Sequence, residues 1–221
     1  MHYKTVLDNG VKILSDFLPH ARSVSLGIWI GVGSRDEPGT QNGISHFIEH
    51  MIFKGTRRRT TLDIARELDA VGGLSNAFPG KANTCIHSRV LDRHFPQLVD
   101  ILSDLFLCSR FDRGEMDREK QVILQEIGMV EDTPEEFIHL FFCHCCWPDH
   151  PLGMSVLGSG ETVSGIDQEQ MLDYFARLYT PERIIIAAAG KIDHEELVSA
   201  FRPLFEPLQP GDSARTRPVA A

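Results

Sequence analysis

Residues 33–56 read GSRDEPGTQNGISHFIEHMIFKGT, and the rest of the chain is best interpreted outward from this stretch. Its glycine-rich first part predicts a loop, which leads into a helix over about 44–53. Residues four apart on a helix share a face, so His46 and His50 can direct neutral imidazoles at one point, with Glu49 beside it. Two histidines and an adjacent carboxylate are what a hydrolytic zinc site needs, and the order His-x-x-Glu-His is the inverted form of the more familiar His-Glu-x-x-His helix.

A catalytic zinc ion usually has three protein ligands, and the best candidate for the third is Glu126. It lies among apolar residues of a second predicted helix, over about 113–130, where an unpaired carboxylate would be costly. Glu119 lies seven residues earlier and projects from nearly the same face. The alternative is a solvated acidic helix face, which fits Glu115 and Asp117 better than it fits Glu126.

The other expected elements alternate irregularly along the chain, which predicts an α+β fold. We expect one domain over residues 1–207, followed by a linker-like tail over 208–221 that is rich in proline and has no periodicity. The expected strands are two within 3–17 around an Asn-Gly turn, then 23–32, 74–79, 83–91 and 183–189; the other expected helices are 61–71, begun by Thr60 or Thr61, and 92–107, 134–146, 167–179 and 193–206, with a turn-rich segment over 150–165.

Composition limits the classes of partner. The chain has 22 basic and 31 acidic residues, a net charge of −9, which argues against nucleic acid and anionic membrane surfaces. No apolar run approaches the roughly 20 residues that span a bilayer. The first residues also lack the pattern of a secretion signal, so we expect a cytoplasmic location.

Five cysteines are present, and three of them, Cys143, Cys145 and Cys146, crowd into one segment. Residues so close together cannot easily form a disulfide framework. One interpretation is a second metal site that includes His144. We favour packing in a core, because the segment is apolar and cysteine is among the most buried residue types.

The stretch 33–56 resembles the active-site segment of the pitrilysin/insulinase family of zinc metallopeptidases, and residues 150–198 resemble the family's corresponding stretch. The interval of 76 positions from His50 to Glu126 also matches the family's spacing. This resemblance implies a largely antiparallel sheet with helices packed on one face.

The same resemblance implies the site and its reaction. It assigns one zinc ion per chain to His46, His50 and Glu126, the catalytic base to Glu49, and an auxiliary catalytic acid to Glu119. The expected activity is hydrolysis of peptides or small unfolded proteins.

The family's substrate-binding strand resembles the segment that begins at Asn76. Asn76, Ala77 and Phe78 agree with the family pattern and are therefore expected to bind substrate, by adding the peptide to a sheet edge. Two positions depart from it: Pro79 replaces a threonine, and Ala82 replaces an acidic residue. Proline cannot donate a backbone hydrogen bond, although edge strands tolerate it.

Family members usually consist of two similar halves that close like a clam shell around the peptide. The resemblance therefore implies a second homologous half, in the same chain or a separate one, or else a homodimer. The alternative is a structural subunit without catalysis, as occurs among relatives of this family. Such subunits typically lose motif residues, and His46, Glu49, His50, Glu119 and Glu126 are all retained here.

Overall fold

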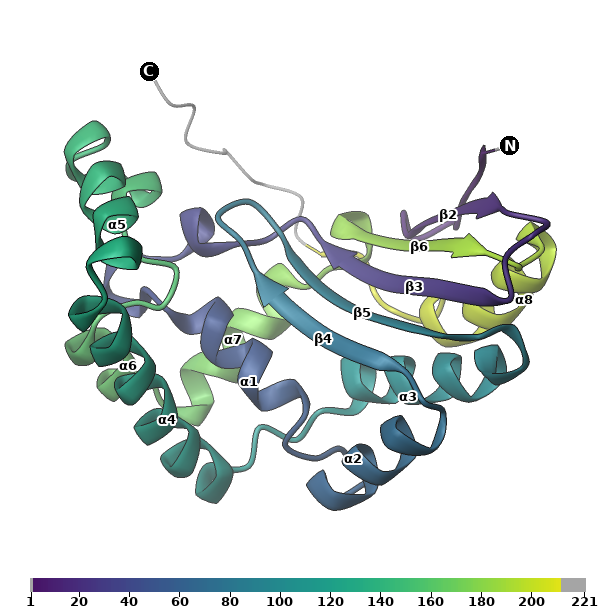
Figure 1. Cartoon of the computed structure of the whole chain (residues 1–221), viewed down its shortest axis with the longest axis horizontal. Coiled ribbons are helices and arrows are strands. Elements are labelled where there is room, and N and C mark those ends of the chain that lie inside the picture. The colour runs from purple at the N-terminus through teal and green to yellow at the C-terminus, as the bar shows by residue number, and fades with distance from the viewer. Residues whose placement is uncertain (1, 212–221) are drawn as a thin grey trace.

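The computed structural model describes residues 2–211, which form a single six-stranded sheet backed by helices (Figure 1). The strand order is β1-β2-β6-β3-β5-β4. The strands are His2–Val6 (β1), Lys12–Phe17 (β2), Ser23–Ile30 (β3), Leu74–Pro79 (β4), Thr84–Leu91 (β5) and Ile184–Gly190 (β6). The helices are Ile44–Ile52 (α1), Thr61–Ala70 (α2), Phe95–Cys108 (α3), Arg113–Asp132 (α4), Pro134–Cys146 (α5), Gly160–Gly165 (α6), Gln168–Leu178 (α7) and His194–Phe205 (α8).

The sheet is largely antiparallel, as expected. Only the pair β2–β6 runs parallel among these strands, and β6 also pairs antiparallel with β3. The last strand in sequence is therefore inserted between β2 and β3, which joins the two ends of the chain in one sheet. β4 lies at one edge of the sheet, so within residues 2–211 its outer side has no strand partner.

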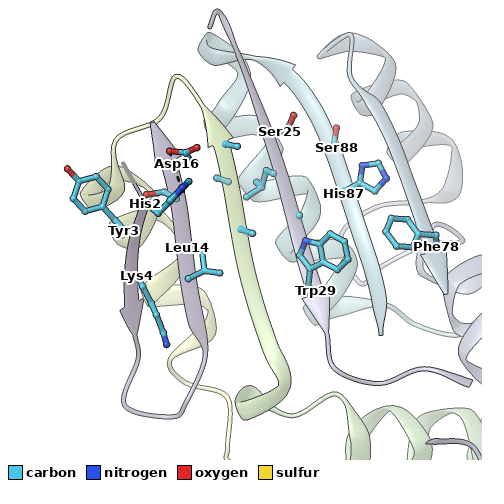
Figure 2. A pocket seen from close by; sticks show the side chains of 16 residues that line it. His2, Tyr3, Lys4, Leu14, Asp16, Ser25, Trp29, Phe78, His87 and Ser88 are labelled. Atoms are coloured by element: carbon cyan, nitrogen blue, oxygen red, sulfur yellow. Dashed lines mark ion pairs between the residues drawn. The ribbon is translucent and has the colours of Figure 1, made fainter. Parts of the chain in front are cut away.

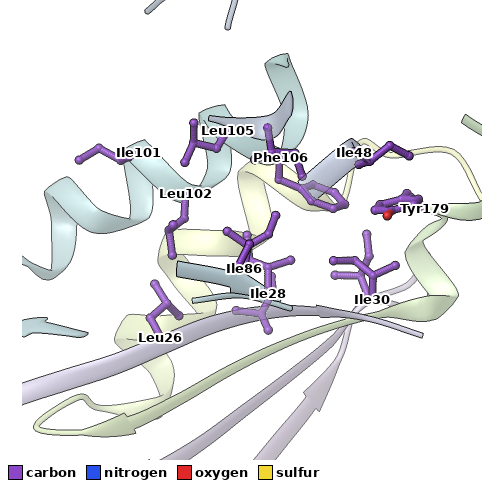
Figure 3. Close-up of a cluster of buried hydrophobic side chains, with 14 of the residues drawn as sticks. Leu26, Ile28, Ile30, Ile48, Ile86, Ile101, Leu102, Leu105, Phe106 and Tyr179 are labelled. Carbon is purple, nitrogen blue, oxygen red and sulfur yellow. The ribbon is translucent and has the colours of Figure 1, made fainter. Parts of the chain in front are cut away.

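The hydrophobic core lies between the sheet and the helices on one of its faces. Alternate residues of the central strands, such as Leu26, Ile28 and Ile30, point to this face and are fully or almost fully buried. They meet apolar side chains of α3, including Leu102 and Phe106 (Figure 3). The period of two in the strands and of about 3.6 in the helix brings these two apolar surfaces together.

The helix boundaries agree closely with those expected. Thr60 begins α2, because its side chain accepts a hydrogen bond from the Asp63 N–H while Asp63 bonds back to it. The short helix α6 was not predicted: Gly160–Gly165 lies in the segment assigned to turns. Its few apolar residues give no helical period, and a Ser159 cap begins it. Of the expected tail, residues 212–221 lie outside the described part of the chain.

Helix α5 contradicts the expectation that its cysteines pack in a core. Cys145 and Cys146 are exposed and Cys143 is only half-buried. Several large apolar side chains of this helix are exposed as well, including Phe141 and Phe142. The apolar sequence of α5 was correctly interpreted as helix, but among the described residues α5 packs mainly against α4 and the segment after it. Within residues 2–211, no helix combines the length and apolar composition needed to cross a membrane.

Candidate metal centre

Helix α1 carries the His-x-x-Glu-His sequence, and its first turn is fixed by a buried carboxylate. Gly43 precedes the helix and has no side chain to cap it. Glu37 takes this role: its Oε2 accepts hydrogen bonds from the Gly43 N–H at 2.7 Å and from Asn42 Nδ2 at 2.9 Å, and its Oε1 accepts one from the Ser45 N–H at 2.9 Å. Three hydrogen bonds to one 5% exposed side chain hold the helix start in one position.

Gly43 is required by its backbone and by its surroundings. Its φ of 96° is left-handed, which disfavours other residues. A Cβ atom there would lie 2.6 Å from the carbonyl oxygen of Leu157. The loop before α1 is thereby locked against the segment around Gly158, more than a hundred residues later.

Helix α4 packs against α1 and brings Glu126 to the two histidines. The Nε2 atoms of His46 and His50 are 3.2 Å apart, and each lies 3.5 Å from Glu126 Oε2. These three residues form a group whose ligand atoms all lie within 4.8 Å of one another, the one such group of three or more among residues 2–211. A tetrahedral zinc ion with bonds of 2.0–2.1 Å separates its ligand atoms by about 3.3–3.4 Å. The triangle formed by His46 Nε2, His50 Nε2 and Glu126 Oε2 therefore has the size that zinc requires.

Glu119 lies behind His50 rather than in the triangle. Its Oε2 is 3.0 Å from His50 Nδ1, and its Oε1 is 2.6 Å from the Lys54 ammonium group. Burial alone would raise the pKa of Glu119, but the hydrogen bonds from Lys54 and His50 outweigh burial and lower it. The ionised carboxylate can accept a hydrogen bond from His50 Nδ1–H, which leaves the lone pair of His50 Nε2 free to face His46 and Glu126.

Glu49 lies beside the triangle, with its Oε2 3.8 Å from His46 Nε2. Burial raises the pKa of this carboxyl to about 7, with opposing effects from His50 and Glu126. Burial also lowers the pKa of His46 to about 4, and repulsion from a charged His50 acts in the same direction. The His46 imidazole is thus neutral at physiological pH, and Glu49 can both take and release a proton there.

The reason given for Glu126 from the sequence was wrong, although its position was expected. Its side chain is 42% exposed, so burial among apolar neighbours does not demand a partner for it. What places it at the histidines is the packing of α4 on α1. Glu37 and Lys54 were missed, although both lie in the stretch quoted first. A glycine before a helix, with an acid nearby, and a lysine four residues after His50 are the available signals.

The three residues expected to bind substrate lie on different sides of β4. Ala77 is 5% exposed and faces the core, next to α1. Asn76 and Phe78 point to the opposite, open face of the sheet. There Phe78 contacts Trp29 and His87, with ring centroids 5.5 and 5.6 Å apart (Figure 2). This face forms a shallow hollow of about 650 Å³ away from the metal triangle.

A two-histidine, one-carboxylate group beside the edge of a helix-backed sheet is an arrangement suited to a hydrolytic metalloprotein. A family model described as insulinase (peptidase family M16) matches residues 12–160, and one described as the peptidase M16 inactive domain matches residues 165–220. The chain therefore belongs to the insulinase family, peptidase family M16. The two matched stretches share one sheet here, since β6 pairs with β2 and β3.

Relatives with curated descriptions carry the name zinc protease. The chain is 42% identical over 202 residues to an uncharacterized zinc protease of Mycobacterium leprae, covering 91% of this chain and 45% of that protein. It is 42% identical over 184 residues to one of Bacillus subtilis, covering 83% and 45%. The chain thus spans about half the length of the curated relatives it matches.

Solved structures share the fold. A protease from Helicobacter pylori has a TM-score of 0.91 at 20% identity, covering 99% of this chain and 53% of that one. The first half of the periplasmic protease PqqL from Escherichia coli has a TM-score of 0.88 at 22% identity, covering 100% and 49%. A peptidase M16 inactive domain from Pseudomonas fluorescens has a TM-score of 0.88 at 15% identity, covering 98% and 53%.

Proposed function

We propose that this chain is the zinc-binding half of a metalloendopeptidase that hydrolyses peptides or small unfolded proteins. The observation that carries the proposal is the triangle of His46 Nε2, His50 Nε2 and Glu126 Oε2, with edges of 3.2, 3.5 and 3.5 Å. Two neutral imidazoles and a carboxylate are the donor set of many hydrolytic zinc sites, and three ligands leave a fourth position open. One zinc ion per chain follows from a single such triangle in the described residues.

When bound, zinc supplies Lewis-acid activation of water and of the scissile carbonyl group. Glu49 takes the proton of the attacking water and then passes it to the leaving amine. Glu119 acts through His50, whose ring it orients by accepting a hydrogen bond from Nδ1–H.

Substrate would enter as an extended strand along the outer edge of β4, beside α1. Ala77 lies at the edge nearest α1, with Asn76 and Phe78 as its neighbours. A second homologous half, in the same chain, in a separate chain or in a homodimer, would form the opposite wall. Relatives about twice as long as this chain support that arrangement. A cytoplasmic location stays a prediction.

The competing proposal is a structural subunit without catalysis. One matching family model is described as an inactive domain, which is compatible with that role. The retained Glu49 favours the enzyme, because a subunit that only supports structure has no use for a partly buried carboxyl group 3.8 Å from His46 Nε2.

The test separates metal binding from catalysis. Elemental analysis of the purified chain should find about one zinc ion, and Glu126→Gln should lose it. Glu49→Gln should keep zinc and, with a second half present, reduce hydrolysis of a quenched fluorescent peptide by at least ~10²-fold, the effect of removing a general base. Full zinc with no hydrolysis in the wild-type assembly would favour the structural subunit, and absence of zinc would refute the metal centre.

A further inference from the structure

Strand β4 directs half of its backbone groups away from the sheet. The Gly80 N–H donates to the Asn83 carbonyl at 2.7 Å, so residues 80 and 83 form a hydrogen-bonded pair. Bonded and non-bonded pairs alternate along an antiparallel ladder, and the register from Leu74 to Pro79 is unbroken. The N–H and carbonyl groups of residues 75, 77 and 79 therefore point outward, to the free edge beside α1.

This edge is short of donors. Position 79 is proline and has no N–H group. The outward N–H of Ala77 is already held by the neighbouring Asn76 Oδ1 at 2.9 Å. The carbonyl groups of all three residues still point outward, so the edge accepts hydrogen bonds from an added strand at every step and donates at fewer.

We propose that Pro79 weakens peptide pairing at one step of this edge: an extended peptide pairs with the free edge of β4, and the peptide carbonyl that faces Pro79 finds no donor. This inference rests on the proposed function. Its consequence is that the peptide carbonyl at this position contributes nothing to binding, while the peptide N–H groups that face the carbonyls of residues 75, 77 and 79 are recognised.

Proline on an edge strand has a second use, since it blocks pairing between the edges of two copies. The two roles differ in what the substitution Pro79→Ala would change. Restoring a donor strengthens peptide binding if the edge receives substrate, whereas loss of an edge block gives self-association and no gain in peptide affinity.

The experiment compares Pro79→Ala with the unchanged chain, both carrying Glu49→Gln so that peptides are bound and not cleaved. The added N–H points outward, so no hydrogen bond within the sheet changes. One recovered hydrogen bond should tighten the binding of a fluorescent peptide about two- to tenfold. Pro148→Ala, at an exposed proline beyond α5, is the matched control and should leave affinity unchanged.

A backbone scan identifies the bond. Each peptide bond of the probe is replaced in turn by a trans alkene, which removes one carbonyl acceptor. At one position, the replacement should lower the affinity of the Pro79→Ala protein for the peptide about two- to tenfold and leave the affinity of the unchanged chain as it was. Equal affinities of the two proteins, a gain spread evenly over the scan, or self-association in its place would overturn the inference. Zinc content and peptide hydrolysis are measured in parallel with proteins that keep Glu49. If these proteins neither bind zinc nor hydrolyse peptide, the proposed function has failed, and not only the inference about Pro79.

Discussion

At the scale of single residues, the site depends on side chains that do not touch the proposed metal. Lys54 is one of them: its ammonium group lies 2.6 Å from Glu119 Oε1, and Glu119 in turn holds His50. Groups that orient a metal-bound histidine typically contribute 10–100-fold to metal affinity.

We therefore expect Lys54→Met to weaken zinc affinity by about tenfold or more, because Glu119 loses its counter-ion and holds His50 less firmly. Lys54→Arg should recover much of the loss. Competition with a chelator dye measures the zinc affinity of each variant, and the imidazole ¹⁵N spectrum of His50 reports its tautomer. Lys120→Met, at a lysine that bonds the Ser164 carbonyl instead, is the control. An unchanged affinity in Lys54→Met would remove the lysine from the site.

His46 predicts a dependence of stability on pH. Its pKa is about 4 in the folded protein and 6.5 without the fold, so the unfolded chain binds more protons between these values. The free energy of unfolding must then fall as pH drops from about 6.5 to 4, by about 3 kcal/mol. Glu49, with a pKa raised from 4.5 to about 7, acts in the opposite direction and masks the effect.

The comparison is therefore made in Glu49→Gln, with a chelator present. Relative to the double variant His46→Gln/Glu49→Gln, its free energy of unfolding should fall by about 3 kcal/mol between pH 7 and pH 4. Urea titrations at several pH values measure it. A difference that does not change with pH would show that His46 is not held neutral by burial.

At the scale of elements, the fixed point of the site is the start of α1. Glu37→Gln keeps the side-chain volume but places an NH₂ group among N–H donors that now point at the two carboxyl oxygens. Buried donors without partners should destabilise the fold by about 1–3 kcal/mol. Because the same turn positions His46, zinc affinity should fall too.

A second helix start provides the control for Glu37. Asp63 completes the cap of α2, on the surface and without contact to the triangle. Asp63→Asn should change stability much less than Glu37→Gln does, and it should leave zinc affinity unchanged. If Glu37→Gln altered stability alone, the carboxylate would be a structural cap that does not position the metal ligands.

At the scale of the whole molecule, the proposed function makes the described residues one wall of a cleft. The triangle, Glu49 and the edge of β4 all lie within these residues, so the chain by itself should bind zinc. A facing wall would exclude water and place donors where charge develops on the scissile carbonyl, and each such donor typically contributes 10²–10³ in rate. The chain alone should therefore hydrolyse a quenched peptide at least ~10³-fold more slowly than the chain with its second half added or fused. Comparable rates in all arrangements would mean that this domain is sufficient, alone or as a homodimer.

The sequence by itself determined most of the elements, and it supplied the residues proposed to carry the chemistry. Periodicity is local, so the boundaries of α1 and α2 followed from residues 44–71, and the spacing of His46, Glu49 and His50 on one helix needed no distant contact. The prediction of turns over residues 150–165 was wrong at α6, because this helix depends on a cap and has no apolar period of its own.

Only the tertiary structure decided how separate elements meet. That Glu126 reaches the histidines follows from the packing of α4 on α1, and that β6 enters between β2 and β3 follows from pairing across the chain. Exposure is likewise a property of packing: the apolar helix α5 reads as a core element, yet its cysteines are exposed because α4 and the segment after α5 are almost all that lies against it. Side chains such as Glu37 and Lys54 gained their roles from partners that local sequence patterns do not identify.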